Sequence, residues 1–492
     1  MAVSNRYNVA WNAIGGSASI IGSLVLFPLG LIAMGADSYG LWIVCFSTTT
    51  LLAQADFGIG TAVVREVAGS TASDRRAGSR SFERVSLTFF FVLAVSLSAL
   101  QLVGLGMYFQ IANPSESRAL VEEFALISSV GLFFALLGRY FVAILQAHQR
   151  FDTERKAAVG GVALRAVLVS AALAVQAPAW VVAFAEMLGV VFPVLVSVWI
   201  ALHSRYTRIQ IPSLRDFRRH AAPLLRYSGP VFVSAFSSLA AMQVPVYIIA
   251  AALSPTAVTA YSAATRIYQT ARMTYGWVTG PALPEVSRLS ALGRLGQMRL
   301  IHERLLMQCV ALGAAISAVL FAAPDLLFSV WLGDDFVQSA PVLQIFGFAV
   351  LVFASYSPGI VLASALGRPG IIAWGAVVWL ALTALGSHFA ASTWGLWGAA
   401  AAAVMPAVVL FPFFMAAPLR LTGLRISAVV VPLVVFAALP TALTFGVRQL
   451  MLPAQSSHLF ELAVCGAMAV SSSVLSLLTK QKIDEIRSKG IK

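Results

Sequence analysis

The residues best able to do chemistry are ionisable side chains inside long apolar stretches. They are four arginines and two acids: Arg139, Arg165, Arg266, Arg272, Asp56 and Glu186. A charged group at the centre of a bilayer costs roughly 2.5–3.5 kcal/mol on insertion scales, so such groups line pathways or pair with one another. Guanidinium groups bind phosphate through two parallel hydrogen bonds. The excess of cations therefore favours an anionic, phosphate-bearing ligand.

The four arginines differ in depth. Arg266 is the strongest candidate, because it lies about ten residues inside a stretch long enough to cross a bilayer. Arg165 is the weakest, because a side chain near a helix end can extend to the interface. Arg266 and Arg272 are about 120° apart around a helix and need not share a ligand. We predict Arg266, Arg272 and Arg139 as substrate-binding residues, with structural pairing, for example of Arg139 with Asp56, as the alternative.

Asp56 and Glu186 are the candidates for ion coupling or gating. A transporter can draw on a coupled ion or on the membrane potential, which supplies about 2.3 kcal/mol per charge per 100 mV. The three cysteines, Cys45, Cys309 and Cys465, lie in apolar runs without CxxC or histidine-partnered spacing. They are interpreted as small buried hydrophobes, and we predict neither a metal site nor a cofactor.

A polar stripe runs along the first apolar stretch. Its members recur at steps of three and four residues: Asn5, Asn8, Asn12, Gly16, Ser19 and Ser23. This spacing places them on one face of a helix, which is expected to face the bundle interior or a water-filled cleft. Small and polar residues also join neighbouring helices. Three amides exceed what packing needs, so Asn5, Asn8 and Asn12 are predicted to contact substrate.

The composition of the chain indicates which kind of secondary structure must position these residues. The chain of 492 residues is 59% hydrophobic and only 11% charged, which excludes a soluble globular protein and predicts an all-α integral membrane protein. Fourteen transmembrane spans fit the apolar pattern, near 8–34, 40–64, 85–109, 123–147, 158–177, 179–202, 228–252, 256–282, 304–323, 340–366, 371–390, 395–416, 427–447 and 458–478.

Positive charge collects on alternate connections between these spans. One side holds 27 of the 33 Lys and Arg residues, whereas the other keeps only Arg118 and Arg448. By the positive-inside rule both termini are cytoplasmic. The net charge of +13 is therefore a topology signal, and we predict no nucleic-acid partner.

A six-span unit is repeated along the chain. Short pairs recur 220 residues apart, Arg6-Tyr7 with Arg226-Tyr227 and Glu83-Arg84 with Glu303-Arg304. An even number of spans gives a parallel repeat, as in transporters built from two halves around a central cavity. The predicted domains are an N-terminal lobe at 1–203, a basic cytoplasmic linker at 204–226, a C-terminal lobe at 227–416, and two extra helices with a basic tail at 417–492.

The second stretch carries a family resemblance. Gly35, Tyr39, Gly40, Leu41 and Trp42, followed by the run Asp56-Phe57-Gly58-Ile59-Gly60 and Arg65, resemble the second helix of bacterial Wzx-type polysaccharide flippases of the multidrug/oligosaccharidyl-lipid/polysaccharide exporter superfamily. The runs Tyr261-Ser262-Ala263-Ala264-Thr265-Arg266 and Gln146-Ala147-His148-Gln149-Arg150-Phe151 are similar to later segments of that family. The resemblance implies two lobes around a cationic cavity for the pyrophosphate and sugars of an undecaprenyl-linked oligosaccharide, with Arg266 in the cavity.

We therefore expect a flippase that moves undecaprenyl-pyrophosphate-linked oligosaccharides across the bacterial inner membrane by alternating access, for synthesis of O-antigen, capsule or exopolysaccharide. Its expected partners are the lipid-linked substrate, membrane lipids and polysaccharide polymerase machinery. An ion-coupled multidrug or amphiphile exporter is the first alternative, although a more acidic cavity would suit it better. A membrane polymerase or ligase is the second, but such an enzyme needs a catalytic constellation on sizeable outward loops. No GxxxxGK[ST] phosphate loop occurs.

Overall fold

The computed structural model describes residues 2–56, 59–72, 76–112, 118–148, 150–207, 209–210, 236–279, 282–365, 369–422, 440–449, 458 and 461–473, and the structural statements below concern these ranges. Within them the chain is helical and has no strand. A helix satisfies its backbone hydrogen bonds within one segment, which the absence of water in hydrocarbon requires. The predicted all-α membrane architecture is confirmed.

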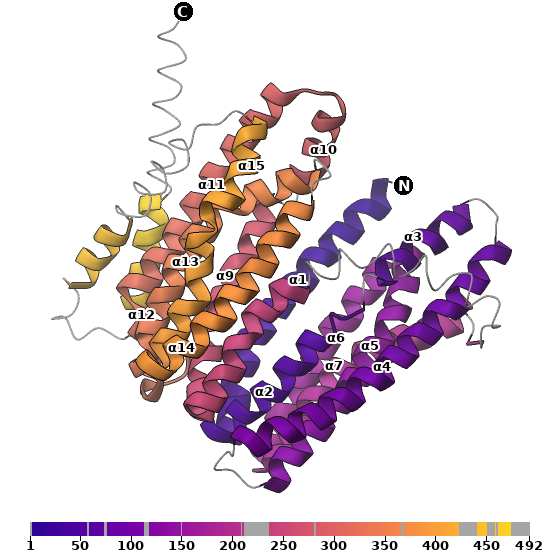
Figure 1. Cartoon of the computed structure of the whole chain (residues 1–492), viewed down its shortest axis with the longest axis horizontal. Coiled ribbons are helices and arrows are strands. Elements are labelled where there is room, and N and C mark those ends of the chain that lie inside the picture. Colours follow the sequence, from indigo (N-terminus) through magenta and orange to yellow (C-terminus); the bar gives the residue numbers. More distant parts are fainter. Residues whose placement is uncertain are drawn as a thin grey trace, which may run out of the picture. The chain divides into compact units, whose positions relative to one another are not determined.

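Contacts divide the chain into two compact units, Met1–Thr259 and Ala260–Lys492. The first unit holds α1 (Ala2–Met34), α2 (Ala36–Leu52), α3 (Ile59–Ala72), α4 (Arg76–Ala112), α5 (Arg118–Ala147), α6 (Phe151–Ala174), α7 (Ala179–His203) and the helix Phe236–Ala252, coloured indigo to magenta in Figure 1. Helix α5 packs against α2, α3, α4 and α7, and α6 packs against α1 and α7. One core of this unit centres on Ile59, Phe90, Tyr140 and Ile144.

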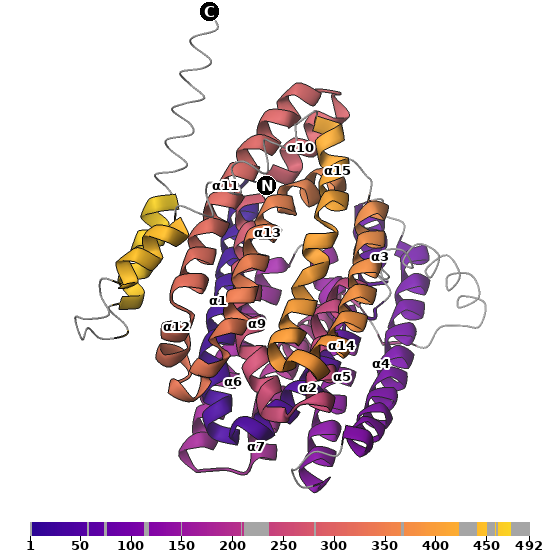
Figure 2. The same ribbon diagram turned by 60° about the vertical axis from the view of Figure 1, so that its left-hand side comes forward.

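The second unit holds most of α9 (Pro255–Thr279), together with α10 (Leu283–Ala291), α11 (Leu295–Ala322), α12 (Pro324–Trp331), the 3-10 helix η2 (Asp334–Ser339), α13 (Ala340–Ala365), α14 (Pro369–Val409) and α15 (Phe411–Thr422). Figures 1 and 2 show α11, α13 and α14 side by side. Helix α13 packs against both neighbours and against α15. The core of this unit includes Val310, Tyr356, Phe414 and Met415.

The helices agree with the predicted spans. Among the described residues, seven helices are long and apolar enough to cross a membrane, and shorter apolar helices at Ile20–Met34, Phe236–Ala252 and Glu461–Ser473 fall on predicted spans. Helix α14 is two arms joined at Gly395, whose φ of 62° and ψ of −142° are not helical, so it accounts for the spans predicted at 371–390 and 395–416. Of the predicted linker and thirteenth span, only 204–207, 209–210 and 440–447 are described.

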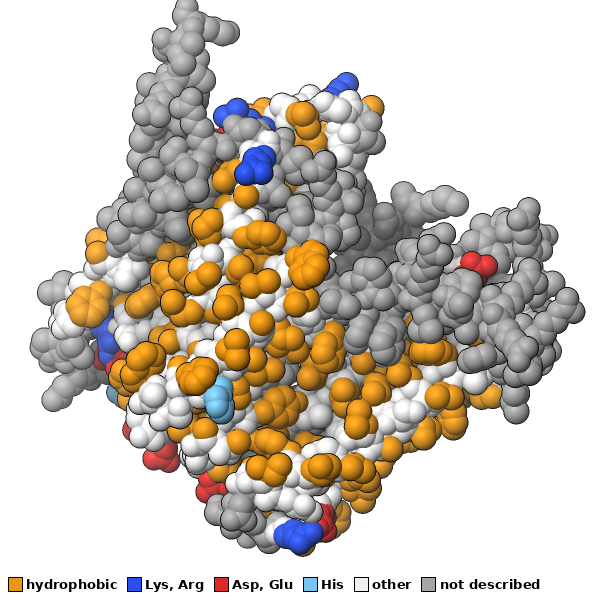
Figure 3. Space-filling model, in the orientation of Figure 1, with side chains coloured by type: hydrophobic (Ala, Val, Ile, Leu, Met, Phe, Trp, Pro, Cys, Tyr) orange, Lys and Arg blue, Asp and Glu red, His pale blue; other side chains and the backbone are white. Residues whose placement is uncertain are grey.

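The surface of the second unit suits contact with lipid. Figure 3 shows apolar side chains spread over its visible face. Four large apolar side chains of α14, those of Trp374, Leu385, Phe389 and Met405, are each more than half exposed. An exposed apolar surface of this size marks interaction with a membrane or a protein.

The prediction of a continuous second span at 40–64 is wrong. Thr48, Thr49 and Thr50 each donate a side-chain hydrogen bond to the carbonyl four residues earlier, a pattern that often bends helices. The N–H of Ala55 then bonds the carbonyl of Leu52, a shortened step that ends α2, and the chain becomes helical again at Ile59. Broken helices at membrane depth occur where the backbone is buried in protein or lines a cavity.

Candidate functional site

Arg139 of α5 lies beside the break between α2 and α3. Its Nη2 donates a 2.6 Å hydrogen bond to Oε1 of Gln54, and its Nη1 lies 3.5 Å from Oδ2 of Asp56. The carbonyl of Asp56 accepts the N–H of Ile59, so Asp56 precedes the first turn of α3, where the helix dipole favours a negative charge. The structure thus brings Asp56 and Arg139 together, as the pairing alternative expects, and adds Gln54 to them.

Arg165 and Glu186 form a second ion pair, between α6 and α7. Nη2 of Arg165 lies 2.7 Å from Oε1 of Glu186, and the glutamate side chain is only 2% exposed. The indole N–H of Trp42 donates to Oε2 of Glu186 at 2.6 Å, and the Arg165 guanidinium lies over the ring of Phe46. One buried carboxylate therefore ties three helices of the first unit together.

Tyr39 and Trp42, near the start of α2, are both buried within the protein. Each ring is only 1% exposed. Trp42 is buried because its N–H has a partner in Glu186, and buried indole groups need such a partner. The ring of Tyr39 packs edge-on against Phe27 and lies against Gly30, where a Cβ atom would come within 2.7 Å of it.

Gly35 and Gly40, the glycines of the run that carries the family resemblance, each occupy a position that requires glycine. Gly35 has a φ of 78°, a left-handed conformation that glycine adopts without steric cost, between α1 and α2. A Cβ atom on Gly40 would lie 2.0 Å from the carbonyl oxygen of Pro255, at the start of α9. Thr259 donates to the carbonyl of Ala36 at 2.7 Å, and Thr256 donates to the Asp37 carboxylate. The motif thus closes the first turns of α2 against the first turns of α9.

A buried polar cluster in the first unit was missed from the sequence. Gln101 of α4 is 2% exposed and donates to Thr49 at 2.9 Å and to Ser128 at 3.0 Å. Tyr247 donates to the neighbouring Thr48, and Tyr108 donates to the carbonyl of Tyr247. The signal in the sequence was the single amide of the predicted span 85–109, Gln101.

Helix α9 carries two of the four candidate arginines, Arg266 and Arg272. The guanidinium of Arg272 lies 3.9 Å from the ring centroid of Phe353 and 5.5 Å from that of Tyr268. Tyr268 in turn stacks on Phe346, so two of the three rings around the Arg272 guanidinium, Phe346 and Phe353, belong to α13. Arg266 is partly buried on the same helix, and its carbonyl accepts the hydroxyl of Thr270. The aromatic rings orient the planar cation through its face.

The asparagine stripe lies on α1, whose backbone is helical over its whole length. The side chains of Asn5, Asn8 and Asn12 lie outside the described residues. On the same stripe, a Cβ atom on Gly16 would meet no atom within 4 Å. Gly22 does not belong to the stripe and is closely packed, because a Cβ atom there would lie 2.3 Å from Val162 of α6.

Among solved structures, the chain is similar to one described as the lipid II flippase MurJ in an inward closed conformation, with a TM-score of 0.75 at 12% identity over 96% of this chain and 100% of that one. It is also similar to inward-facing and outward-facing multidrug resistance MATE family transporters of the MOP superfamily. Their TM-scores are 0.64 and 0.56 at 18% and 17% identity, over 82% and 85% of this chain and 96% of each of those chains. These likenesses establish a shared fold.

No curated protein matches the chain significantly. The family model described as polysaccharide biosynthesis protein matches residues 6–290, more than half of the 492 residues. This agrees with the resemblance carried by the second span, whose residues all lie within the matched range. The chain therefore belongs to the polysaccharide biosynthesis protein family and has the fold of MOP-superfamily transporters.

Proposed function

We propose that this protein is a flippase that moves undecaprenyl-pyrophosphate-linked oligosaccharide units across the bacterial inner membrane for cell-surface polysaccharide synthesis. Membership of the polysaccharide biosynthesis family supports the substrate class. The fold shared with a lipid II flippase supports translocation of a lipid-linked molecule in place of enzymatic turnover. Transport would proceed by alternating access of the lobes at 1–203 and 227–416. Both termini would lie in the cytoplasm, and a polysaccharide polymerase would be the partner.

The observation that carries the proposal is the position of the Arg272 guanidinium against the rings of Phe353 and Tyr268. A guanidinium in the middle of a membrane helix is costly, and ionisable groups at such depth typically serve a pathway. The ring of Phe353 contacts one face of the cation, and the N–H donors of a guanidinium lie in its plane, directed away from such a ring. A pyrophosphate is a ligand that this geometry suits. Arg266, on the same helix, is proposed as a second substrate contact.

The two candidate arginines of the first unit lie beside acids. Arg139 and Arg165 each lie within ion-pair distance of a carboxylate. We propose that Arg139 contacts substrate only when its pairing with Asp56 loosens, and that the stripe of Asn5, Asn8 and Asn12 contacts the sugars. The open space beside Gly16 on that stripe supports the second assignment.

Replacing Arg272 with alanine is expected to reduce transport by about 10- to 100-fold, because a hydrogen bond to a charged group contributes about 1.5–3 kcal/mol. Uptake of a fluorescent undecaprenyl-pyrophosphate oligosaccharide by proteoliposomes measures this. Arg272→Lys keeps the charge but loses the planar fork, so it should retain part of the activity. Arg118→Ala removes a largely exposed arginine on α5 and should leave uptake unchanged. Full uptake by Arg272→Ala would contradict the assignment.

Replacing Asp56 with asparagine is expected to abolish the dependence of transport on an imposed ion gradient while substrate binding remains. Asp56 lies at the helix break and is 15% exposed, so it is accessible to an ion, whereas Glu186 is buried, ion-paired with Arg165 and hydrogen-bonded by Trp42. Uptake with and without a proton or sodium gradient measures the coupling. Gradient-dependent uptake that persists in Asp56→Asn would remove Asp56 as the coupling residue and leave Glu186.

An ion-coupled multidrug exporter is the second candidate, favoured by the fold shared with MATE transporters. Expulsion of a cationic dye down an imposed ion gradient, with no movement of the lipid-linked oligosaccharide, would favour this function. The arginines of α9 would then be structural.

A further inference from the structure

Helix α9 has two faces of different character. The residues of one face recur at steps of three and four, and none of them is more than 6% exposed: Tyr261, Ala264, Tyr268, Ala271 and Tyr275. The residues of the opposite face recur in the same way and are all partly or fully exposed: Ser262, Arg266, Gln269, Met273 and Trp277. At 1.5 Å per residue, this exposed face runs along the helix for about 22 Å.

Helix α13 fixes the direction in which the exposed face of α9 points. The ring of Tyr268 stacks on Phe346, with their centroids 5.1 Å apart. One face of turns further along, the hydroxyl of Tyr275 donates a 3.0 Å hydrogen bond to the carbonyl of Val350. These contacts hold the buried face of α9 against α13, so the exposed face is directed away from α13.

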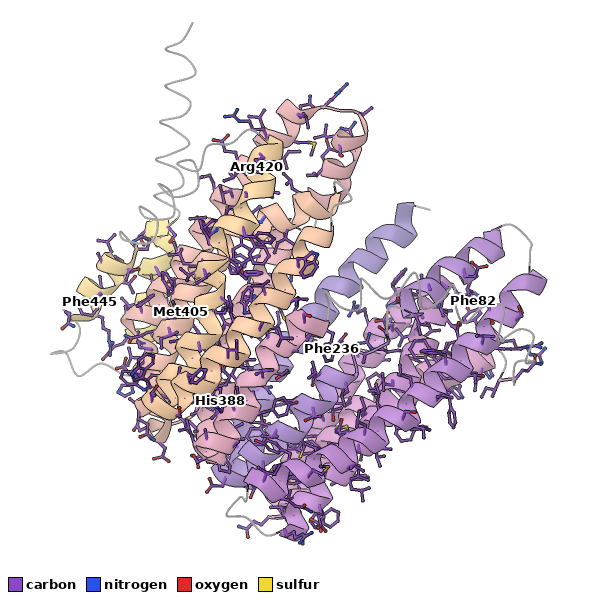
Figure 4. The ribbon with its side chains drawn as sticks, in the orientation of Figure 1. Phe82, Phe236, His388, Met405, Arg420 and Phe445 are labelled. Atoms are coloured by element: carbon purple, nitrogen blue, oxygen red, sulfur yellow. The ribbon has the colours of Figure 1, made fainter. Side chains whose placement is uncertain are left out.

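The composition of this exposed face is unsuited to lipid. It carries the cation of Arg266 and the amide of Gln269, and α9 is not among the seven described helices that are apolar enough to cross a membrane by composition alone. A charged group in hydrocarbon costs roughly 2.5–3.5 kcal/mol on insertion scales. The exposed side chains of Leu385, Phe389 and Met405 on α14 are apolar instead, and Figure 4 labels Met405. The exposed face of α9 therefore suits water or a polar ligand.

An exposed tryptophan lies on the same face. Trp277 is 57% exposed, and Met273, one turn earlier, is 54% exposed. A Cβ atom on the adjacent Gly276 would meet no atom within 4 Å, so there is open space beside the indole. An indole combines a flat apolar body with an N–H donor at its edge. A sugar ring is complementary to it, because such a ring has C–H groups on its faces and hydroxyl groups at its rim.

We propose that Trp277 binds a sugar ring of the lipid-linked oligosaccharide, an inference that rests on the proposed function. The sugar stacks on the indole, whose N–H donates to a hydroxyl oxygen. Gln269 and Arg266 lie about 12 Å and 16 Å from Trp277 along the helix axis. The guanidinium attracts the pyrophosphate by its charge, which directs the sugars along the face toward Trp277. Because stacking depends on C–H groups that many sugar rings share, Trp277 accepts more than one glycan.

The test measures binding of two lipids to the full-length protein in nanodiscs. One is undecaprenyl pyrophosphate carrying a trisaccharide of N-acetylglucosamine, and the other is undecaprenyl pyrophosphate alone. The wild type is expected to bind the glycosylated lipid more tightly. Trp277→Ala should weaken binding of that lipid by about fivefold, through the loss of one aromatic contact, and should leave binding of the bare lipid unchanged. Trp277→Phe keeps a ring and should retain most of the preference.

Trp199 of α7 provides the matched control. It is 64% exposed and lies near the end of its helix, as Trp277 does, but Leu195 one turn earlier is also exposed, so this face is apolar. Trp199→Ala should leave binding of both lipids unchanged. The inference would be overturned if the wild type showed no preference, or if Trp277→Ala weakened binding of both lipids equally or of neither.

Chemical labelling tests whether the side chain at position 277 meets water. The three native cysteines are buried, so a hydrophilic maleimide should label Trp277→Cys and spare Trp199→Cys. The glycosylated lipid should protect Trp277→Cys from the reagent, whereas the bare lipid should not. If the reagent spared Trp277→Cys in a protein that elutes normally on gel filtration, the inference would fail, because the tryptophan would then be an anchor at the membrane interface.

The outcome is separable from that of the proposed function because binding needs no transport. Glycan-dependent binding through Trp277, in a protein that moves no lipid-linked oligosaccharide, would support the sugar contact and reject the flippase. Normal transport by Trp277→Ala with unchanged binding would reject the sugar contact and support the flippase.

Discussion

Replacing Glu186 with alanine is expected to lower the free energy of unfolding by about 3–5 kcal/mol, because it leaves the buried Arg165 cation without its carboxylate. The two side chains are 2% and 14% exposed, and the carboxylate also accepts the indole N–H of Trp42. The variant should therefore lose both contacts of the Glu186 carboxylate, the ion pair with Arg165 and the hydrogen bond from Trp42. Thermal unfolding of the purified protein in detergent, followed by gel filtration, measures the loss.

Replacing both members of the pair by apolar residues separates the loss of pairing from the loss of packing. The change Arg165→Met together with Glu186→Leu should be less damaging than Glu186→Ala, since replacing both members of a buried pair by apolar residues is often nearly neutral. The exposed pair of Arg118 and Glu122 is the matched control, and Glu122→Ala should cost at most about 0.5 kcal/mol. Equal stability of Glu186→Ala and Glu122→Ala would contradict this interpretation.

Replacing Gly40 with valine is the second change expected to have a large effect. The first side-chain atom would lie 2.0 Å from the carbonyl oxygen and 2.6 Å from the carbonyl carbon of Pro255. Both are backbone atoms, so α2 and α9 must separate, and overpacking of this kind costs about 1–3 kcal/mol. We expect a lower unfolding temperature and, under the proposed function, transport close to background, because the bonds of Thr256 and Thr259 to α2 are lost as well.

Gly104 provides the control for this prediction. It lies within α4, and a Cβ atom there would meet nothing within 4 Å. Gly104→Ala should be neutral or slightly stabilising, because alanine is favoured over glycine in a helix by roughly 1 kcal/mol. Gly40→Ala should already be harmful. If both alanine variants behave like the wild type, the close approach of α2 to Pro255 is not needed.

Much of the architecture could be predicted because a bilayer imposes a simple rule. Each span needs about 20 mainly apolar residues, and apolar stretches of this length can be recognised in a single sequence. The predicted connection at 391–394 thus ends directly before the non-helical Gly395, and the family resemblance in the second span is confirmed by the match over residues 6–290. The domain boundaries and the roles of the site residues stay predictions.

The break in the second span was not predicted. Residues 53–56 contain no proline or glycine and lie between apolar residues on both sides, so hydropathy averaged over the span indicates one helix. The end of α2 depends on hydroxyl-to-carbonyl bonds of three threonines and on the side chains of Gln54 and Asp56, which find Arg139 on α5. Such a partner, more than 80 positions away in the chain, is supplied by tertiary packing.

The sequence by itself determined that this chain is a membrane protein, which residues carry charge within its spans, and which family it resembles, because these properties depend on composition and local order. Only the tertiary structure decided which charges pair. Arg165, the weakest candidate for binding substrate, lies against Glu186, and the indole N–H of Trp42 donates to the same buried carboxylate. Arg272 lies against aromatic rings of α9 and α13. Depth along a helix can be counted from residue numbers, but the neighbour that a side chain meets depends on how the helices are rotated and packed.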